Sequence, residues 1–281
     1  MSAERTVGSV AVLMYHSIAT STTRSFARLT VDPALFDEHL AALREQQLDV
    51  ISFSEVPSVL AAGRQAVAIT IDDGLADAAD GAAPALLRHG LPATFFVPSA
   101  FIDTRASWMR GEDASRPMLS WSALDEMARA GFEIGSHGKR HLAADVNDED
   151  IVRRDAAESR TDLEQGLGRA VPSFAYPFGY HAARARRAVR KIGFAQACIV
   201  SELPVQEGDD HWALPRLTVP QGTPPETLLT MIRSRPTSAS RHWTHSKQRV
   251  WHLGRRLAGW GPPESGRMTP TEASRMMEIP P

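Results

Sequence analysis

Val67-Ala-Ile-Thr-Ile-Asp-Asp-Gly74 is the stretch that decides the fold. Its Val, Ile and Thr residues favour a β-strand, and the apolar run ends abruptly at Asp72 and Asp73. Two adjacent carboxylates repel each other when both are ionised, so a buried strand that ends in such a pair requires a nearby cation or an unusual protonation state. The stretch therefore predicts a charged site at the tip of a buried strand.

Short apolar strands alternate with amphipathic helical stretches over residues 8–235, which predicts an α/β fold with a largely parallel sheet. The expected strands lie at residues 10–15, 50–53, 67–71, 93–97, 132–135, 173–176, 195–200 and 214–219, a barrel-like number. Helix starts are expected at Asp32-Pro33, Ser120, Asp148 or Asp150, and Pro225. In the helix after Asp150, Ile151, Leu163 and Leu167 are predicted to face the core.

Polar side chains follow several of these strands, at the carboxyl ends where functional residues of parallel α/β folds collect. His137 and His141 have the His-x-x-x-His spacing that lets two imidazoles face one point. With Asp73 they would form a metal site that keeps positions open for water and substrate. Asp72 is then free to act as a general base, and His16 is the candidate acid for the leaving group.

Each of these motifs has a simpler explanation when it is taken alone. Asp-Asp-Gly is common in turns, His-x-x-x-His is common on surfaces, and a histidine after a strand, such as His16, is often a buried residue with satisfied hydrogen bonds. The combination of all three is what predicts a metal-dependent hydrolase.

The composition indicates one main domain, predicted at residues 1–235, because 281 residues with 43% hydrophobic side chains can fill a sizeable core. A formal net charge of −2 gives no strong field to attract nucleic acid, and it is compatible with a neutral substrate. Cys198 is the only cysteine, which excludes internal disulfides and cysteine metal sites, and its apolar surroundings predict a packing role.

Residues 236–281 are predicted to form a C-terminal extension rich in Ser, Thr, Pro and Arg. Apolar residues from Trp243 to Trp260 recur at near-helical spacing among basic residues. A helix packed on the flank of the domain is the favoured interpretation, and a basic amphipathic helix on an anionic membrane surface is the alternative. Residues 261–281 are expected to form a poorly ordered tail.

Neither a signal-peptide pattern nor a stretch of roughly 18 apolar residues is found. The sequence therefore predicts a cytoplasmic protein that is membrane-peripheral only if the extension binds lipid.

Thr-Ile-Asp-Asp-Gly, Ser-His-x-x-x-His and Tyr-Pro-Phe-Gly occur in an order and at distances that resemble the polysaccharide deacetylases, carbohydrate esterase family 4 with the NodB-homology domain. The resemblance covers residues 8–235 and extends to Leu-Pro-Ala-Thr-Phe-Phe-Val at residues 91–97. It implies a distorted (β/α)7-type barrel followed by a helical or disordered C-terminal extension. It also implies hydrolysis of N-acetyl groups on amino sugars, or of O-acetyl groups on xylan, with a divalent metal. Zinc is the expected ion, with Co, Ni, Mn and Fe as alternatives.

The resemblance assigns roles that agree with the chemical reasoning. Asp72 resembles the family's catalytic base, and Asp73 resembles a metal ligand together with His137 and His141. Tyr176-Pro177-Phe178 resembles the substrate-groove segment whose backbone N–H after the proline holds the tetrahedral oxyanion.

Three departures from the family pattern are visible. The Ser or Thr that usually follows the first metal histidine is Gly138, which removes a hydroxyl and is expected to loosen the loop. The arginine that usually orients the base is replaced by Ala175, and Arg216 is the candidate substitute from another strand. The late Leu-x-His motif of the catalytic acid is missing from residues 200–235.

Val-Leu-Met-Tyr-His-Ser-Ile at residues 12–18 accounts for the missing motif. It resembles the circularly permuted branch of the family, which acts on poly-N-acetylglucosamine and carries its acid histidine near the N-terminus. His16 is assigned the acid role on this basis.

The sequence thus predicts a metal-dependent deacetylase acting on an N-acetylhexosamine unit of a saccharide. A hydrolase of a small linear or cyclic amide and a non-catalytic sugar-binding relative are the alternatives. We expect its substrate to be a cytoplasmic intermediate of glycan assembly. In one version of this expectation the intermediate is carried on a lipid and the extension touches the membrane.

Overall fold

The computed structural model describes residues 8–235, the range of the predicted catalytic domain apart from residues 1–7. The predictions for residues 236–281, both the basic helix and the tail, lie outside the described residues. None of the helices within residues 8–235 combines the length and the apolar character that a bilayer span requires.

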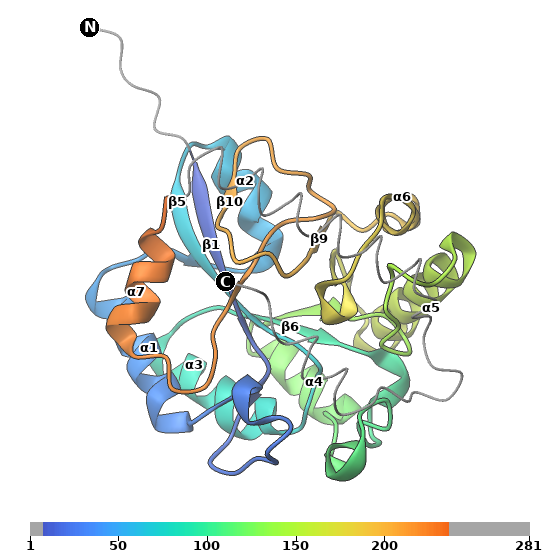
Figure 1. Ribbon diagram of the computed structural model, residues 1–281, viewed down its shortest axis with the longest axis horizontal. Helices are drawn as coiled ribbons and strands as arrows, with labels where there is room; N and C mark the ends of the chain where they lie inside the picture. Colours follow the sequence, from blue (N-terminus) through green and yellow to red (C-terminus); the bar gives the residue numbers. More distant parts are fainter. Residues whose placement is uncertain (1–7, 236–281) are drawn as a thin grey trace, which may run out of the picture.

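A nine-stranded sheet forms the centre of the molecule (Figure 1). Its strands follow the order β10-β1-β5-β6-β7-β8-β9, with β11 beside β1 and β4 beside β5. Among these nine strands, only β10 pairs antiparallel. The strands are β1 (Ser9–Tyr15), β4 (Val50–Ile51), β5 (Gln65–Ile71), β6 (Thr94–Val97), β7 (Glu133–Ser136), β8 (Ser173–Ala175), β9 (Gln196–Cys198), β10 (Val205–Gln206) and β11 (Leu217–Thr218).

Residues 214–218 connect β9, at one end of the sheet, with β1 near the other end. Leu214 forms a parallel bridge with Cys198 of β9, and Leu217 in β11 pairs with Leu13 of β1. The circuit of strands therefore closes through a segment that is only partly regular, which makes the barrel a distorted one. The predicted α/β barrel class is confirmed.

All eight expected strands are present, although several are shorter than expected. The sequence did not predict β10 or the separate pair of β2 (Ser17–Ile18) and β3 (Thr30–Val31). Strands of two residues are too short to produce a measurable alternation of polar and apolar side chains, so their pairing depends on tertiary contacts.

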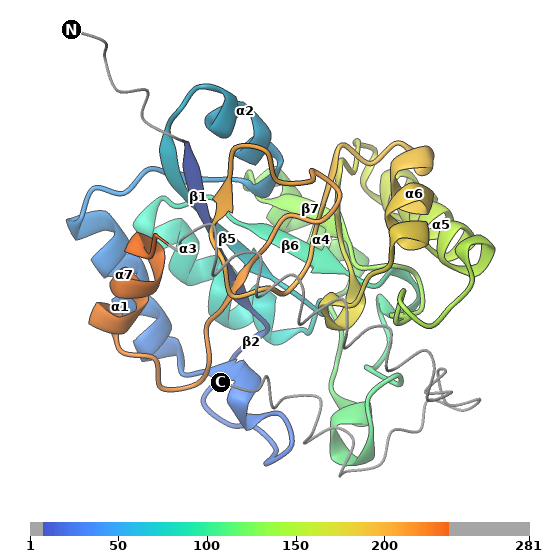
Figure 2. The ribbon, with the colours of Figure 1, turned by 45° about the horizontal axis from the view of Figure 1, so that its top comes forward.

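Helices surround the sheet, with α1, α3 and α7 at one side of the molecule and α5 and α6 at the other (Figures 1 and 2). They are α1 (Pro33–Glu45), α2 (Val56–Ala61), α3 (Ala83–His89), α4 (Trp121–Arg129), α5 (Glu149–Leu167), α6 (Ala183–Ile192) and α7 (Pro225–Arg233). Shorter helical turns are η1 (Ala27–Leu29), η2 (Phe53–Glu55), η3 (Ala78–Ala82), η4 (Ser99–Phe101), η5 (Gly111–Ser115) and η6 (Pro177–Gly179).

The predicted caps of α1 and α4 are confirmed. The Asp32 side chain accepts a hydrogen bond from the Ala34 N–H, and the Ser120 side chain accepts one from the Ala123 N–H. The apolar stripe predicted for α5 is correct at Leu163 and Leu167 but wrong at Ile151, which is 42% exposed. Val152 faces the core instead, because it lies on the same helical face as Leu163.

Side chains of the sheet separate into two clusters on its two faces. The outer cluster, which includes Leu13 and Ile69, packs against the surrounding helices. The inner cluster includes Val12, Ala68 and Cys198 and fills the interior of the barrel. Cys198 is fully buried there, and burial raises the pKa of its thiol, so the predicted packing role is confirmed.

Candidate active site

The alternation of side chains along β1 and β5 places two of the predicted site residues on the inner face. Val12 of β1 and Ala68 of β5 belong to the inner cluster, and steps of two residues from them lead to His16 and Asp72. The register of the two strands pairs their last residues, so His16 and Asp72 leave the sheet at the same level. The same edge receives the residues that follow β7.

Asp73, His137 and His141 come together at this edge. Each offers one ligand atom, and these atoms lie within 4.8 Å of one another. Asp73 Oδ1 is 3.4 Å from His137 Nε2 and 3.1 Å from His141 Nε2. All three side chains are buried, and Asp73 and His141 both have positive φ angles, which turn their side chains toward the shared point.

The hydrogen bonds of this cluster fit a bound cation. His137 Nδ1 donates to the Ala175 carbonyl oxygen at 2.8 Å, which orients the ring so that Nε2 faces Asp73. Burial alone would raise the pKa of Asp73, but its hydrogen bonds with His137 and His141 hold that pKa well below its usual value. A deprotonated carboxylate and two imidazole nitrogens are a donor set suited to zinc and similar divalent ions.

Arg216 forms a two-pronged ion pair with Asp72. Its Nη1 and Nη2 atoms donate to the two carboxylate oxygens at 2.7 and 2.6 Å, and Nη1 also donates to Thr70 Oγ1 at 3.1 Å. Burial alone would raise the pKa of Asp72, but Arg216 and His137 more than offset this and hold it below its usual value. Asp72 is thus ionised and fixed in direction, with one oxygen 3.9 Å from His137 Nε2.

His16 is partly exposed, and its ring contacts Phe26 edge-on at 6.4 Å between centroids. Burial lowers the pKa of His16, and the nearby charges of Asp73 and Asp72 oppose that effect. The imidazole therefore lies close enough to the acidic pair to be influenced by both carboxylates.

The three residues of the predicted groove segment occupy different positions. The Tyr176 side chain is fully buried in the outer cluster, because it lies two residues after Phe174 on the face of β8 turned toward the helices. Any contact of Tyr176 with substrate must therefore come from its backbone. Phe178 is 40% exposed, and its ring meets His141 edge-on at 4.7 Å between centroids.

Pro177 begins the turn η6, so the N–H of Phe178 belongs to the first turn, where no acceptor within the helix is available. Phe178 has a φ of +61°, which is strained for a residue with a side chain. The N–H that follows Pro177 thus has no acceptor within the turn and is available to a ligand.

The loop that carries His137 and His141 is held tightly, contrary to the expectation from Gly138. Asp155 of α5 accepts hydrogen bonds from the backbone N–H groups of Lys139 at 2.8 Å and Arg140 at 3.2 Å. Ser159 of α5 donates to the Gly138 carbonyl oxygen at 3.0 Å. Asp155 and Ser159 of α5 therefore hold the loop in place of the missing hydroxyl.

Because Gly138 has no side chain, the carboxylate of Asp155 has room to approach the loop. Its φ is +73°, and a Cβ atom at this position would lie 2.8 Å from Asp155 Oδ2. Asp155 could not be predicted from the sequence, because a carboxylate on a charged helix has no local feature that marks it as buried. Trp108, whose ring stacks on His141, was not predicted either.

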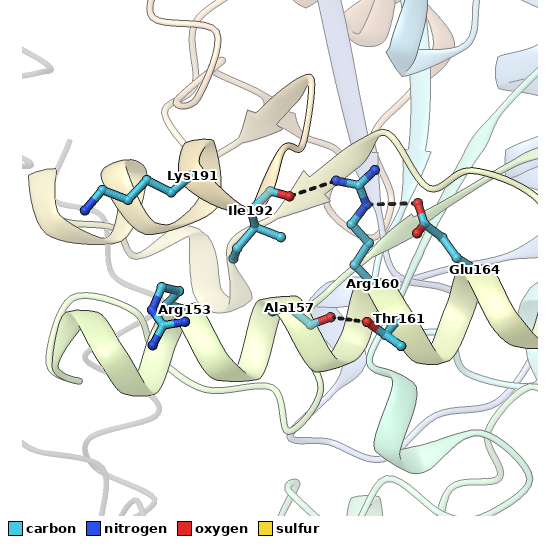
Figure 3. A pocket seen from close by; sticks show the side chains of 7 residues that line it. All are labelled: Arg153, Ala157, Arg160, Thr161, Glu164, Lys191 and Ile192. Carbon is cyan, nitrogen blue, oxygen red and sulfur yellow. Dashed lines mark hydrogen bonds and ion pairs between the residues drawn. The ribbon is translucent and has the colours of Figure 1, made fainter.

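A hollow of about 420 Å³ lies between α5 and α6, away from these residues (Figure 3). It is lined by Arg153, Ala157, Arg160, Thr161, Glu164, Lys191 and Ile192. Arg160 bridges the two helices there, because it donates to Glu164 and to the Ile192 carbonyl oxygen. These contacts fix α5, the helix that carries Asp155.

The fold is a distorted α/β barrel with clustered potential metal ligands at one edge of its sheet, and comparison with known proteins identifies its family. The family model described as polysaccharide deacetylase matches residues 60–197. The YxkH protein of Bacillus subtilis (strain 168), named as a polysaccharide deacetylase, is 24% identical over 215 residues, which cover 75% of this chain and 71% of that protein.

Two solved structures share the fold. The deacetylase PplD of Streptococcus pyogenes, in complex with acetate, has a TM-score of 0.72 and 22% identity, covering 80% of this chain and 99% of that one. A de-N-acetylase from Aggregatibacter actinomycetemcomitans has a TM-score of 0.67 and 20% identity, covering 79% and 99%. This chain belongs to the polysaccharide deacetylase family. Membership of this family indicates that the protein is a hydrolase that acts on acetyl amides or esters of carbohydrates.

Proposed function

We propose that this protein hydrolyses the acetyl amide of an N-acetylated amino sugar within a saccharide and releases acetate. The observation that carries the proposal is the Asp72–Arg216 ion pair directly beside the cluster of Asp73, His137 and His141. It provides one carboxylate for proton transfer and a separate donor set for a metal, in the fold of a deacetylase family.

Asp73, His137 and His141 would hold a divalent ion, with zinc the first candidate. When bound, the ion would polarise the acetyl carbonyl and lower the pKa of water at the site. The fit rests on the shared direction of the two Nε2 atoms toward Asp73 Oδ1 and on the Ala175 carbonyl that fixes the tautomer of His137.

Asp72 takes the proton from the attacking water in this proposal. A general base must be ionised before it can accept a proton, and Arg216 keeps Asp72 in that form despite its burial. Arg216 acts as a positioning residue, because both carboxylate oxygens are hydrogen-bonded to its guanidinium group.

Protonated His16 donates its proton to the leaving nitrogen, and the Phe178 N–H donates a hydrogen bond to the oxyanion. The position of His16 after β1, level with Asp72, supports the acid role and the permuted arrangement in which the acid comes from the N-terminal strand. The matched family region begins at residue 60, so the role of His16 rests on its geometry in this chain.

The N-acetyl substrate is favoured over an O-acetyl ester by the likeness to a protein named as a de-N-acetylase. Acetate release from N-acetylglucosamine oligomers should therefore exceed release from acetylated xylan, and ring opening of a cyclic amide should not occur. If acetylated xylan or the cyclic amide were turned over faster than the N-acetylglucosamine oligomers, the proposed substrate class would be wrong.

Single variants separate the metal role from the base role. Asp73→Ala should lose the metal, as measured by elemental analysis, because it removes the only anionic ligand. Asp72→Asn should keep the metal but lose activity by about 10²-fold or more, since the amide cannot accept the proton. Metal retained in Asp73→Ala, or full turnover in Asp72→Asn, contradicts the assigned roles.

A further inference from the structure

The two histidines of the proposed metal site are oriented in different ways. His137 is anchored through Nδ1, which bonds to the Ala175 carbonyl oxygen. His141 Nδ1 is buried and has no hydrogen-bond partner among the described residues. Metal-binding histidines are normally oriented by a hydrogen bond from the ring nitrogen that faces away from the metal. The ring of His141 must therefore be held in another way.

Aromatic rings contact His141 on two sides. The Trp108 indole stacks on the imidazole, with 5.0 Å between centroids and 28° between the ring planes. The Phe178 ring meets it edge-on at 76°. A stacked face restricts rotation of the imidazole out of its plane, and the edge contact blocks the other direction. This restraint matters because the backbone of His141 has a φ of +55°, outside the preferred regions.

Trp108 is itself held in place from behind. Its ring contacts Phe101 at 4.4 Å between centroids, on the side of the short helix η4. The segment between η4 and α4 that carries Trp108 is fastened to the loop after β2, because the Asp113 carboxylate accepts hydrogen bonds from the hydroxyls of Thr23 and Ser25 at 2.6 and 2.5 Å. The two segments lie side by side at the same end of the molecule (Figures 1 and 2).

We propose that Trp108 is a positioning residue for His141 and takes the place of the missing hydrogen bond at Nδ1. The flat face of the indole keeps His141 Nε2 directed at Asp73, so the ligand set is formed before the ion binds. The inference rests on the metal role assigned to His141 under the proposed function. It links metal affinity to the order of the segment between η4 and α4.

Zinc affinity of the full chain, measured by competition with a chromogenic chelator, tests this. Trp108→Leu keeps an apolar side chain but is smaller and has no flat face, and it should raise the Kd for zinc by roughly tenfold. Trp108→Phe restores an aromatic face and should recover most of that loss. The matched control is Trp212→Leu, since Trp212 is also partly buried but contacts Arg190 and the Phe194 carbonyl instead.

Cobalt quenching of fluorescence gives a second measurement that needs no turnover. A tryptophan stacked on a ligand should be quenched when Co²⁺ binds, so Trp108→Phe should lose quenching that Trp212→Phe retains. Equal zinc affinity of Trp108→Leu and the unaltered protein, with His141→Ala losing zinc, overturns the role of Trp108 alone. Equal zinc affinity of His141→Ala and the unaltered protein overturns the metal assignment of the proposed function as well.

Discussion

At the scale of residues, the buried charge of Asp72 is controlled by a partner 144 positions away. Arg216 lies in the segment that closes the barrel, on the inner face, two residues after Leu214 of the inner cluster. A buried arginine and a buried carboxylate stabilise each other as a pair, because either one alone would be a buried charge whose desolvation is not compensated. The pair therefore fixes both the charge and the direction of the proposed base.

Arg216→Met should shift the pH dependence of catalysis. Burial raises the pKa of Asp72 and Arg216 lowers it, so loss of the guanidinium raises that pKa. Asp72 is then protonated over more of the acidic range, and the acidic limb of the profile of kcat/KM against pH moves to higher pH. Arg216→Lys keeps a positive charge and should move the limb less.

The profile is measured on metal-loaded protein whose folding is checked by circular dichroism. An acidic limb at the same pH in Arg216→Met and the unaltered protein would show that Asp72 is not the group that titrates there.

At the scale of elements, the loop from His137 to His141 and the helix α5 form one unit. Asp155 bonds to two backbone N–H groups of the loop, and Ser159 joins Ser136 of β7 to the Gly138 carbonyl oxygen. The loop therefore depends on the position of α5 for its shape, and the proposed metal ligands depend on the loop.

Gly138→Ala should destabilise the protein through two effects that can be separated. The positive φ costs about 1–2 kcal/mol for any residue with a Cβ, and the contact with Asp155 adds to it. In an Asp155→Ala background the second part disappears, so the free-energy cost of Gly138→Ala should fall. Urea unfolding of the two single variants and the double variant measures this coupling.

Gly168→Ala is the matched control. Gly168 ends α5 with a φ of +63°, and its Cβ would meet nothing within 4 Å. It should show the backbone cost alone and no coupling to Asp155→Ala. Additive costs for Gly138→Ala and Asp155→Ala would mean that the glycine does not serve to admit the carboxylate.

At the scale of the whole molecule, the barrel brings residues from β1, β5, β7 and residues 214–218 to one edge. Residues 236–281 follow α7 and lie outside the described residues, so their proposed contact with a membrane remains a prediction.

Removal of residues 236–281 should weaken binding to anionic vesicles and lower activity on a lipid-linked N-acetylated sugar, while activity on a free oligosaccharide is kept. Basic residues near tryptophans favour anionic lipid surfaces, so the loss should be greater at low salt. Vesicle co-sedimentation of the full chain and of residues 1–235 is the measurement. Equal sedimentation of the two would rule out the membrane contact predicted from the sequence, and neutral vesicles serve as the control.

The sequence by itself determined the order of the eight expected strands and of the helices α1, α4, α5 and α7, the caps at Asp32 and Ser120, and the chemical identity of the donors in the proposed site. These features depend on local periodicity and on residue type, which can be read from neighbouring positions. The sequence also identified Arg216 as a candidate partner of the base, through the resemblance to a family.

Only the tertiary structure decided which side chains meet. It turned the Tyr176 side chain toward the helices, placed Asp155 against Gly138 and stacked Trp108 on His141. These contacts depend on strand register, on closure of the barrel and on the rotation of α5, and each of these is set by packing across many residues. The pair of Asp72 and Asp73 after β5 can thus be predicted from the local sequence. Their different partners, Arg216 for Asp72 and the two histidines for Asp73, come from distant parts of the chain.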